Sequence, residues 1–590
     1  MMKRVVTFLL AALLLFSLVS CGNKKPAEQL TPPTLKYLYN TSEGHKAIGE
    51  YLQSALAVAG FTMTLENQEW NTFLNTRKDG NYAIARNGWL ADYNDPISFL
   101  DMWTTYSGNN DVQFGKGAHA NLKMYSIDLT PYGGAKIENG TWAETYDVLM
   151  GLIKSSTDEV KRFEMMHLAE DMLMETGAIV PLYFYTDLYM IDDKVDGFFS
   201  NPLGYKYFMF SKVDGKTNNI NVCLASEPDT LDPALNSAVD GATMVAHLFS
   251  GLAKWVKTAD GRLEIVADCA EELVDGTVNS DGTVTYVYKL RQGLKWSNGE
   301  ELKASDFVNS WNRAASAELG ADYGYMFEIV DGYGTDKLNA VADDANRTIT
   351  VTIKNSAKYW DELLAFPCFF PVHSSAFTDE KWATKPETYI CNGPYVMDSW
   401  DHNSKIVLKK NSNYIDAGEI TMEQISCYLS DDANNMLANF KKGDWQLIDD
   451  VPTNEIAALK RDFPTEFKIS GQIGTYYVCF NINFDLLPGS ELKGVEKEKA
   501  QAEIRKAMAL LFDRNYIVEE IAQGGQVPAS SFVAMGLTDA NGSGEFYKLA
   551  NKAAGNSYLG YYDTSKEAFE SNTAKALETL KKYYKLNVAE

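Results

Sequence analysis

The sequence lacks the short motifs that mark the common enzyme classes. It contains no HExxH, no GxSxG and no phosphate-binding GxxxxGK[ST] loop, and its six histidines are scattered along the 590 residues. The DYND run at 92–95 has neither the glycine nor the glutamate of a calcium-binding loop. We therefore expect no enzyme activity, no metal and no cofactor.

Paired cysteines are also absent. None of the seven cysteines forms a CxxC motif, which excludes the usual zinc and thioredoxin-type sites. Apart from Cys21, they are widely spaced. An oxidising compartment would permit disulfides between them, but their spacing identifies no pair, and buried free thiols are expected for most of them.

A run of basic residues is missing as well. The formal net charge is −25, which argues against nucleic acid and against adhesion to an anionic lipid surface. Hydrophobic residues make up 45% of the chain and aromatic residues 12%, as in a folded globular protein. A chain of this length exceeds one hydrophobic core, so we expect two to four lobes.

The N-terminus has the pattern of an exported lipoprotein. Residues 1–20 contain Lys3 and Arg4, then an apolar run too short for a comfortable membrane span, and they predict a signal peptide. The small residues before Cys21 resemble a lipobox, which implies lipidation of Cys21. A signal peptide with a chance cysteine is the alternative. Residues 21–33 are polar and contain proline, so they are predicted to be a flexible tether.

Strand and helix patterns alternate from residue 34 onward. Residues 34–41, 61–70 and 81–90 predict strands, whereas 44–60 and 70–80 predict helices. A capping box at 156–159 predicts the start of a helix that Gly177 ends, followed by a strand at 178–191. Repeated strand–helix–strand units indicate an α/β fold with a largely parallel sheet and helical covers.

Several longer motifs resemble one family. The segments EPDTLDPAL (227–235), LKWSNGEELKASDFVNSWNR (294–313), NGPYVMDSW (392–400) and KKGDWQLIDDVP (441–452) are similar to the peptide/nickel class (family 5) of extracytoplasmic solute-binding proteins. LENQEWNTFLNTR (65–77) and ARNGWLADYNDPISFL (85–100) resemble its oligopeptide-binding members. The resemblance implies a periplasmic-binding-protein-like (class II) α/β fold, with two ligand-enclosing lobes, an extra lobe and mixed sheets under helical covers.

The order of these motifs differs from that of the family. Residues 34–213 resemble the family's C-terminal part and 218–590 its N-terminal part, so the sequence looks circularly permuted, unless the order is an artefact of gene assembly. The resemblance then implies a ligand-binding lobe three at 34–187 and 474–590. It implies a ligand-binding lobe one at 188–250 and 372–473, and an accessory lobe two at 251–371.

The resemblance also assigns ligand-binding residues. Asp92 matches the position that binds the α-ammonium group of a peptide, and Arg86 matches an arginine that faces the carboxylate of short ligands. Their even spacing keeps both on one face if the strand continues, within a reach of about 20 Å. A structural ion pair between them or with neighbouring residues is the alternative.

Further binding residues follow from the same resemblance. Trp70 and Trp89 match tryptophans that line side-chain pockets, and Arg77 matches a second pocket arginine. Tyr323 matches a tyrosine near the ligand backbone, and Tyr477 one on the hinge side. Each of them could instead belong to the core or the rim.

The expected function is capture of short peptides outside the cytoplasm by a lipid-anchored monomer that delivers them to the permease of an ABC importer. The anchor would hold the protein at the cell surface or in the periplasm. A receptor of the same fold for nickel complexes, haem or oligosaccharide remains an alternative, as does a peptide sensor without a transport role.

Overall fold

The computed structural model describes residues 29–586, and its largest element is an eleven-stranded mixed sheet. The strands run in the order β18–β19–β20–β11–β21–β6–β22–β3–β1–β2, and β23 (Val527–Pro528) pairs with β6. Their bounds are Tyr395–Asp401, Lys405–Lys410, Gln424–Leu429, Ile220–Ala225, Leu447–Ile448, Ile179–Ile191, Phe467–Phe480, Ile84–Leu90, Leu35–Asn40 and Met63–Gln68. The predicted α/β class, with mixed sheets and helical covers, is confirmed. The largely parallel sheet expected from the strand–helix–strand units is wrong, because most neighbouring strands of this sheet pair antiparallel.

The first part of the chain folds as its alternating pattern predicts. Strands β1, β2 and β3 are parallel and are connected by helices α1 (Glu43–Ala57) and α2 (Trp70–Lys78). Ile48 and Leu52 on α1 are buried against the sheet. Helix α4 (Glu159–Glu175) also forms, but its N-cap is Asp158, whose side chain accepts a hydrogen bond from the backbone of Lys161, so the helix starts later than the predicted capping box.

Two long strands connect the halves of the large sheet. β6 and β22 pair along most of their lengths, and both extend from the side of β3 to the side of β21. Their pairing is interrupted between Gly471 and Thr475 of β22, opposite Tyr185 of β6. The lobe boundaries expected at 187/188 and 473/474 fall within these two strands.

Two helices cover the half of the sheet that contains β21. Helices α8 (Ala433–Lys442) and α9 (Ile456–Asp462) pack on a separate core that includes Met190, Ile448 and Phe467, which come from the central strands. Residues 277–353 form a smaller antiparallel sheet, which helix α6 (Ala304–Ala314) contacts. Its strands are β14 (Thr277–Val278), β15 (Val284–Lys289), β17 (Thr348–Ile353) and β16 (Ala340–Asp343).

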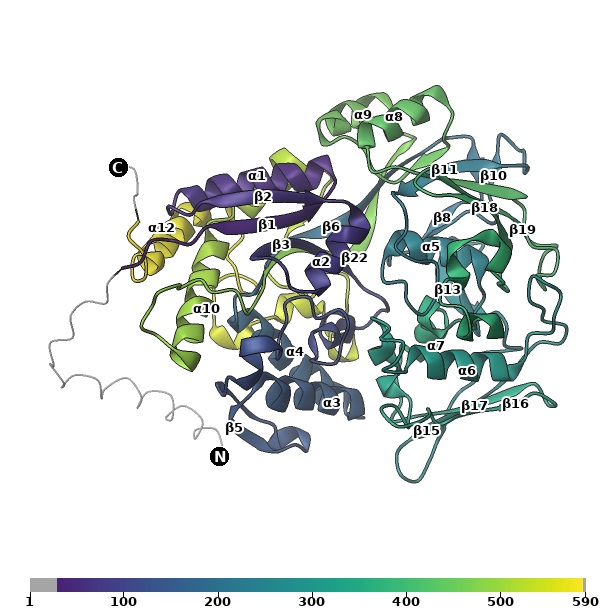
Figure 1. Ribbon diagram of the computed structural model, residues 1–590, viewed down its shortest axis with the longest axis horizontal. Coiled ribbons are helices and arrows are strands. Elements are labelled where there is room, and N and C mark those ends of the chain that lie inside the picture. Colours follow the sequence, from purple (N-terminus) through teal and green to yellow (C-terminus); the bar gives the residue numbers. More distant parts are fainter. Residues whose placement is uncertain (1–28, 587–590) are drawn as a thin grey trace.

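The two ends of the described chain lie against each other. The backbone N–H of Leu30 donates to the carbonyl of Tyr583 at 2.8 Å, and the N–H of Lys585 donates to Leu30 at 2.8 Å. Figure 1 shows both ends beside α12 (Phe569–Leu580), which packs on α10 (Gly494–Leu510). The first and last described segments are therefore spatial neighbours.

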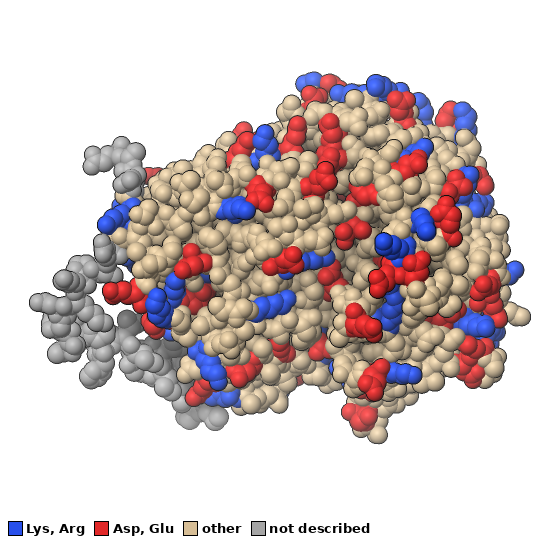
Figure 2. All heavy atoms as spheres, in the orientation of Figure 1, with Lys and Arg blue, Asp and Glu red and all other residues tan. Residues whose placement is uncertain are grey.

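The charged side chains are mixed over the surface, and the described cysteines are free thiols. Acidic and basic side chains are interspersed over the face shown in Figure 2. All six cysteines among residues 29–586 are free and buried, so buried thiols are found where disulfides were left open. Cys21, the signal peptide and most of the tether lie outside the described residues. Within the described range, no helix is both long and apolar enough to cross a bilayer.

Candidate functional site

A cavity of about 500 Å³ lies beside β6 and β22, the two strands that connect the halves of the large sheet. Residues from both halves line it. On one side they come from α1, α2 and the end of β3, and on the other from the segments 203–206, 236–242 and 430–456. The N-terminal turns of α1 and α5 (Val239–Leu248) open onto it. The sheet therefore brings together residues that are far apart in the sequence.

Asp92 lies in this cavity with half of its carboxylate unsatisfied. Tyr323 donates its hydroxyl to Oδ1 of Asp92 at 2.9 Å, whereas Oδ2 is buried and has no hydrogen-bond partner among the described residues. Burial raises the pKa of Asp92 well above its usual range, and the hydrogen bond from Tyr323 opposes this shift only in part. A buried carboxylate in this state gains a strong, charge-assisted hydrogen bond if a cationic donor enters.

Arg86 lies in the same cavity without a carboxylate partner. No ion pair forms on it within residues 29–586, and its Nε is buried and unbonded. Its guanidinium stands over the ring of Tyr476, 5.3 Å from the centroid. Burial opposes the charge, but Tyr185 and Tyr476 outweigh it and raise the pKa of Arg86, so this side chain stays a cation that can receive an anion.

The structure corrects the geometry expected for this pair. Strand β3 ends at Leu90, so Asp92 is in the following loop and the pleat does not set its direction. Arg86 and Asp92 do not pair with each other, yet both line the cavity. The alternative of a structural ion pair between them is therefore wrong for the described conformation.

Tyr185 is directed by an irregularity in the sheet. Residues 472–474 of β22 bulge opposite Tyr185, and such bulges re-aim side chains beside binding sites. Its hydroxyl occupies the space above Gly88, where a Cβ would lie 2.3 Å away. At Gly474, a Cβ would lie 2.2 Å from the side chain of Leu90. Glycine at both positions lets Tyr185 reach the cavity beside Arg86.

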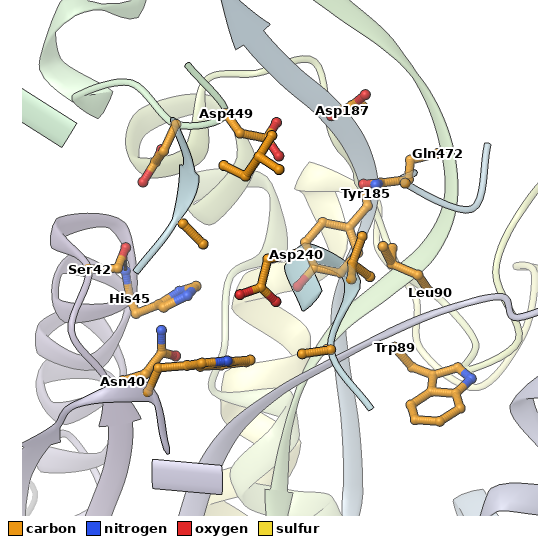
Figure 3. Close-up of a pocket in the computed structure, with 18 of the residues that line it drawn as sticks. Asn40, Ser42, His45, Trp89, Leu90, Tyr185, Asp187, Asp240, Asp449 and Gln472 are labelled. Atoms are coloured by element: carbon orange, nitrogen blue, oxygen red, sulfur yellow. Dashed lines mark hydrogen bonds between the residues drawn. The ribbon is translucent and has the colours of Figure 1, made fainter. Parts of the chain in front are cut away.

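The remaining predicted residues divide between the cavity and the core. Trp70 lines the cavity and stacks on Phe73 at a centroid distance of 5.9 Å. Trp89 also lines it, but its indole N–H donates to the carbonyl of Ser98 at 2.7 Å. In Figure 3 its ring is turned away from the group around Asn40 and His45. Arg77 lines the cavity too, where it forms a 2.7 Å ion pair with Asp111.

Tyrosine positions differ from the expectation. Tyr323 reaches the cavity, but its hydroxyl is bonded to Asp92. Tyr477 is fully buried outside the cavity lining, where it packs edge-on against Trp103 and Phe532. The adjacent Tyr476 faces Arg86 instead, because successive residues of a strand point to opposite faces. The predicted ligand contact of Tyr477 is thus corrected to a core role.

Sequence reasoning missed several lining residues. His45 follows the N-cap of α1, and burial together with the charge of Arg86 lowers its pKa well below the usual range, so it is neutral. Lys206 is buried between Asp187, at 3.0 Å, and Asp449, at 2.7 Å. Asp240 projects from the first turn of α5. Asp240 follows the LDP motif at 231–233 and Asp449 lies in the motif at 441–452, so a sequence signal was available for these two residues.

One contact bridges the cavity's rim. Lys78 at the end of α2 forms an ion pair with Asp322, and its ammonium lies 3.3 Å from the hydroxyl of Ser237. Ser237 in turn donates to Asp322 at 2.9 Å. We call this set the rim contact. No group of three His, Cys, Asp or Glu side chains within residues 29–586 is placed to hold a metal ion.

Known proteins resemble this chain over about half of their own length. The oligopeptide-binding protein OppA of Bacillus subtilis is 30% identical over 54% of this chain and 57% of its own. A protein of Escherichia coli named as a probable deoxycholate-binding periplasmic protein, YgiS, is 30% identical over 52% of this chain and 55% of its own.

A solved structure confirms the fold. The murein tripeptide binding protein MppA of Escherichia coli superimposes with a TM-score of 0.51 and 23% identity, over 62% of this chain and 66% of that protein. The sequence model of the bacterial extracellular solute-binding proteins, family 5 Middle, matches residues 18–111 and 264–585. With more than half of its residues in that match, the chain belongs to the family 5 extracellular solute-binding proteins.

Proposed function

We propose that this protein captures short peptides by their two charged ends and delivers them to an ABC importer. One observation carries the proposal: a carboxylate and a guanidinium, Asp92 and Arg86, line one cavity and neither has an ion-pair partner among the described residues. An unmodified peptide is a zwitterion, so its ammonium fits Asp92 and its carboxylate fits Arg86. Relatives named for oligopeptide and dipeptide binding support this ligand class.

The test is a thermal-shift series with tri- to pentapeptides, each free and N-acetylated. A free peptide at 100 times its Kd should add about 2.7 kcal/mol to the free energy of unfolding. N-acetylation removes the ammonium and should abolish most of the shift. Equal shifts from the acetylated peptides would contradict the role of Asp92.

A second candidate is an anionic amphipathic ligand, because one relative is named for deoxycholate. Arg86 among tyrosines would suit the carboxylate of such a molecule. The unpaired carboxylates Asp92 and Asp240 count against it, because an anion without a cationic group would leave both unbalanced. Deoxycholate therefore belongs in the same series, and stabilisation by it but by no peptide would replace the peptide proposal.

The ligand would be enclosed by movement of two lobes, with the boundaries given by the family resemblance. Lobe three would comprise 34–187 and 474–590, lobe one 188–250 and 372–473, and lobe two 251–371. Two crossing strands and a cavity walled from both sides suit closure about a hinge. Small-angle scattering with and without peptide should show compaction, and an unchanged radius of gyration would count against it.

Circular permutation is part of the proposal. Its support is the motif order together with the bonded ends at Leu30 and Lys585, since permutation succeeds where termini lie close together. A chain rewritten to begin at residue 218, with the present ends joined, should bind the same peptides. Genomic sequencing that shows the unpermuted order would instead identify an assembly artefact.

Lipid anchoring at Cys21 rests on sequence alone. The signal-like segment before it supports an extracytoplasmic protein tethered to the cell membrane. Mass spectrometry of the exported protein should find a lipidated N-terminal cysteine, and an unmodified Cys21 would remove the anchor from the proposal.

A further inference from the structure

Asp240 is a second carboxylate in the cavity that lacks a partner. It lies in the first turn of α5, where a negative charge is favourable near the helix N-terminus. The helix N-terminus favours the negative charge, but it supplies no donor to Oδ2. This oxygen is buried and has no hydrogen-bond partner within residues 29–586. Figure 3 shows the carboxylate directed into the space between His45 and Tyr185.

The carboxylates of the cavity, Asp240 included, fall into two groups. Asp111 is paired with Arg77, and Asp187 and Asp449 share Lys206. Four further lining residues form no ion pair in the described part of the chain: Asp92, Asp240, Asp431 and Asp450. Against these four, Arg86 is the one lining lysine or arginine that lacks a carboxylate partner within residues 29–586.

A zwitterionic peptide does not balance these charges. Its ammonium and carboxylate would match Asp92 and Arg86, which leaves a surplus of negative charge facing the rest of the ligand. His45 cannot offset it, because burial and Arg86 lower its pKa and keep the ring neutral. Asp431 and Asp450 are exposed to solvent, so the buried Oδ2 of Asp240 is the remaining unpaired oxygen that a cationic group would satisfy.

We propose that Asp240 binds a cationic side chain of the peptide, so that this protein prefers peptides containing lysine or arginine. The inference rests on the proposed function, because it assumes a peptide held at Asp92. Asp240 is then a specificity-determining residue, whose free oxygen accepts a hydrogen bond from an ammonium or guanidinium.

The first test uses the unaltered protein. Trialanine variants with lysine at position one, two or three are compared by calorimetry with the same peptides carrying norleucine, which has the same four-carbon chain without the ammonium. At one position the lysine peptide should bind about tenfold or more tightly, the usual size of a hydrogen bond to a charged group. Equal affinity at every position would overturn the inference.

The second test assigns the effect to the residue. Asp240→Asn should remove the lysine preference and leave the affinity of the norleucine peptide within about twofold, since that peptide does not use the carboxylate. Asp193→Asn makes the same charge change at an exposed position outside the cavity lining and should keep the preference. A preference that survives Asp240→Asn, or disappears in Asp193→Asn alone, would contradict the assignment.

The two proposals fail in different ways. If peptides bind and N-acetylation weakens them, but lysine and norleucine peptides bind alike, the inference about Asp240 is wrong and the peptide function stands. If neither set binds, the proposed function fails and the inference fails with it.

Discussion

Two aspartates in one loop show how folding and binding use the same side chain differently. Asp92 and Asp95 are both buried, with 9% and 7% of their surface exposed. Asp95 accepts two hydrogen bonds from Arg162, at 2.7 and 2.9 Å, and one from the backbone of Ile97 at 3.0 Å. Asp92 accepts a hydrogen bond from the hydroxyl of Tyr323, keeps a buried and unbonded Oδ2, and is a lining residue of the cavity. Only two residues therefore separate a carboxylate completed by the protein from a carboxyl group left for a ligand.

The same contrast holds between the packed interior and the cavity. Within α10, the buried Arg505 is paired with Glu498. Glu170 of α4 accepts hydrogen bonds from the backbone of Phe532 and Val533, and burial raises its pKa to about 8, so it is largely neutral. An unbonded oxygen and a raised pKa occur in both regions. The open space beside the charge is what distinguishes the candidate site.

The largest effect is expected for stability at Asp95. Asp95→Asn leaves the Arg162 guanidinium buried without its counter-charge and should lower the free energy of unfolding by about 3 to 5 kcal/mol. Urea denaturation of the empty protein measures it. Peptide affinity of the folded fraction should stay unchanged, so a loss of affinity without a loss of stability would break the comparison.

Asp92→Asn should weaken peptide binding, whereas Asp95→Asn weakens the fold. Removing one partner of a buried charge pair typically costs at least about 2 kcal/mol, so peptide affinity should fall about 30-fold or more. Calorimetry with a free tripeptide measures the fall. An unchanged Kd would show that Asp92, like Asp95, serves the fold.

The pH dependence sharpens this prediction. The pKa of Asp92 is raised in the folded empty protein, and only its ionised form attracts an ammonium. Wild-type affinity should therefore decrease as the pH falls through that raised pKa, whereas Asp92→Asn should show a flatter profile. The stability that the protonated carboxyl contributes is lost as the pH rises. The empty Asp92→Asn protein should accordingly gain stability relative to wild type toward neutral pH.

The smallest effect is expected at the rim contact. Asp322 lies outside the cavity lining, and its ion pair with Lys78 is partly exposed, at 16% and 22% for the two side chains. Asp322→Asn should weaken peptide binding by no more than about fivefold, because such pairs contribute about 1 kcal/mol. Glu50→Gln, which removes the exposed pair with Lys46, is the control and should have no effect. Equal effects of both variants would mean that the rim contact does not favour the bound arrangement.

Local pattern was enough to predict the first strands and helices. The apolar alternation of 34–90 and the glycine at position 80 place β1 to β3 and the two helices close to their observed bounds. The start of α4 was misplaced because Ser156, Asp158 and Glu159 all suit a helix N-terminus, and only the backbone geometry selects Asp158. Sequence alone therefore leaves helix ends uncertain where several capping residues are adjacent.

The site was predicted only in part, for a physical reason. Arg86 and Asp92 belong to a motif, so a resemblance could find them. The network of Lys206 with Asp187 and Asp449 joins three separate segments, and no local pattern reports it. Tyr477 was assigned from the family resemblance, whereas its ring packs in the core and the neighbouring Tyr476 is the one beside Arg86.

The bulge at 472–474 has a consequence for mechanics. β6 and β22 continue through it as covalent chains while their ladder is interrupted there. The lost pairing weakens the β6–β22 ladder at this point, and Gly471 beside it has free space around its missing side chain. Twisting β6 and β22 at that point would turn one half of the sheet against the other without breaking the remaining ladder. Tyr185, directly opposite, would move with the strand and change its contact with any molecule bound beside it.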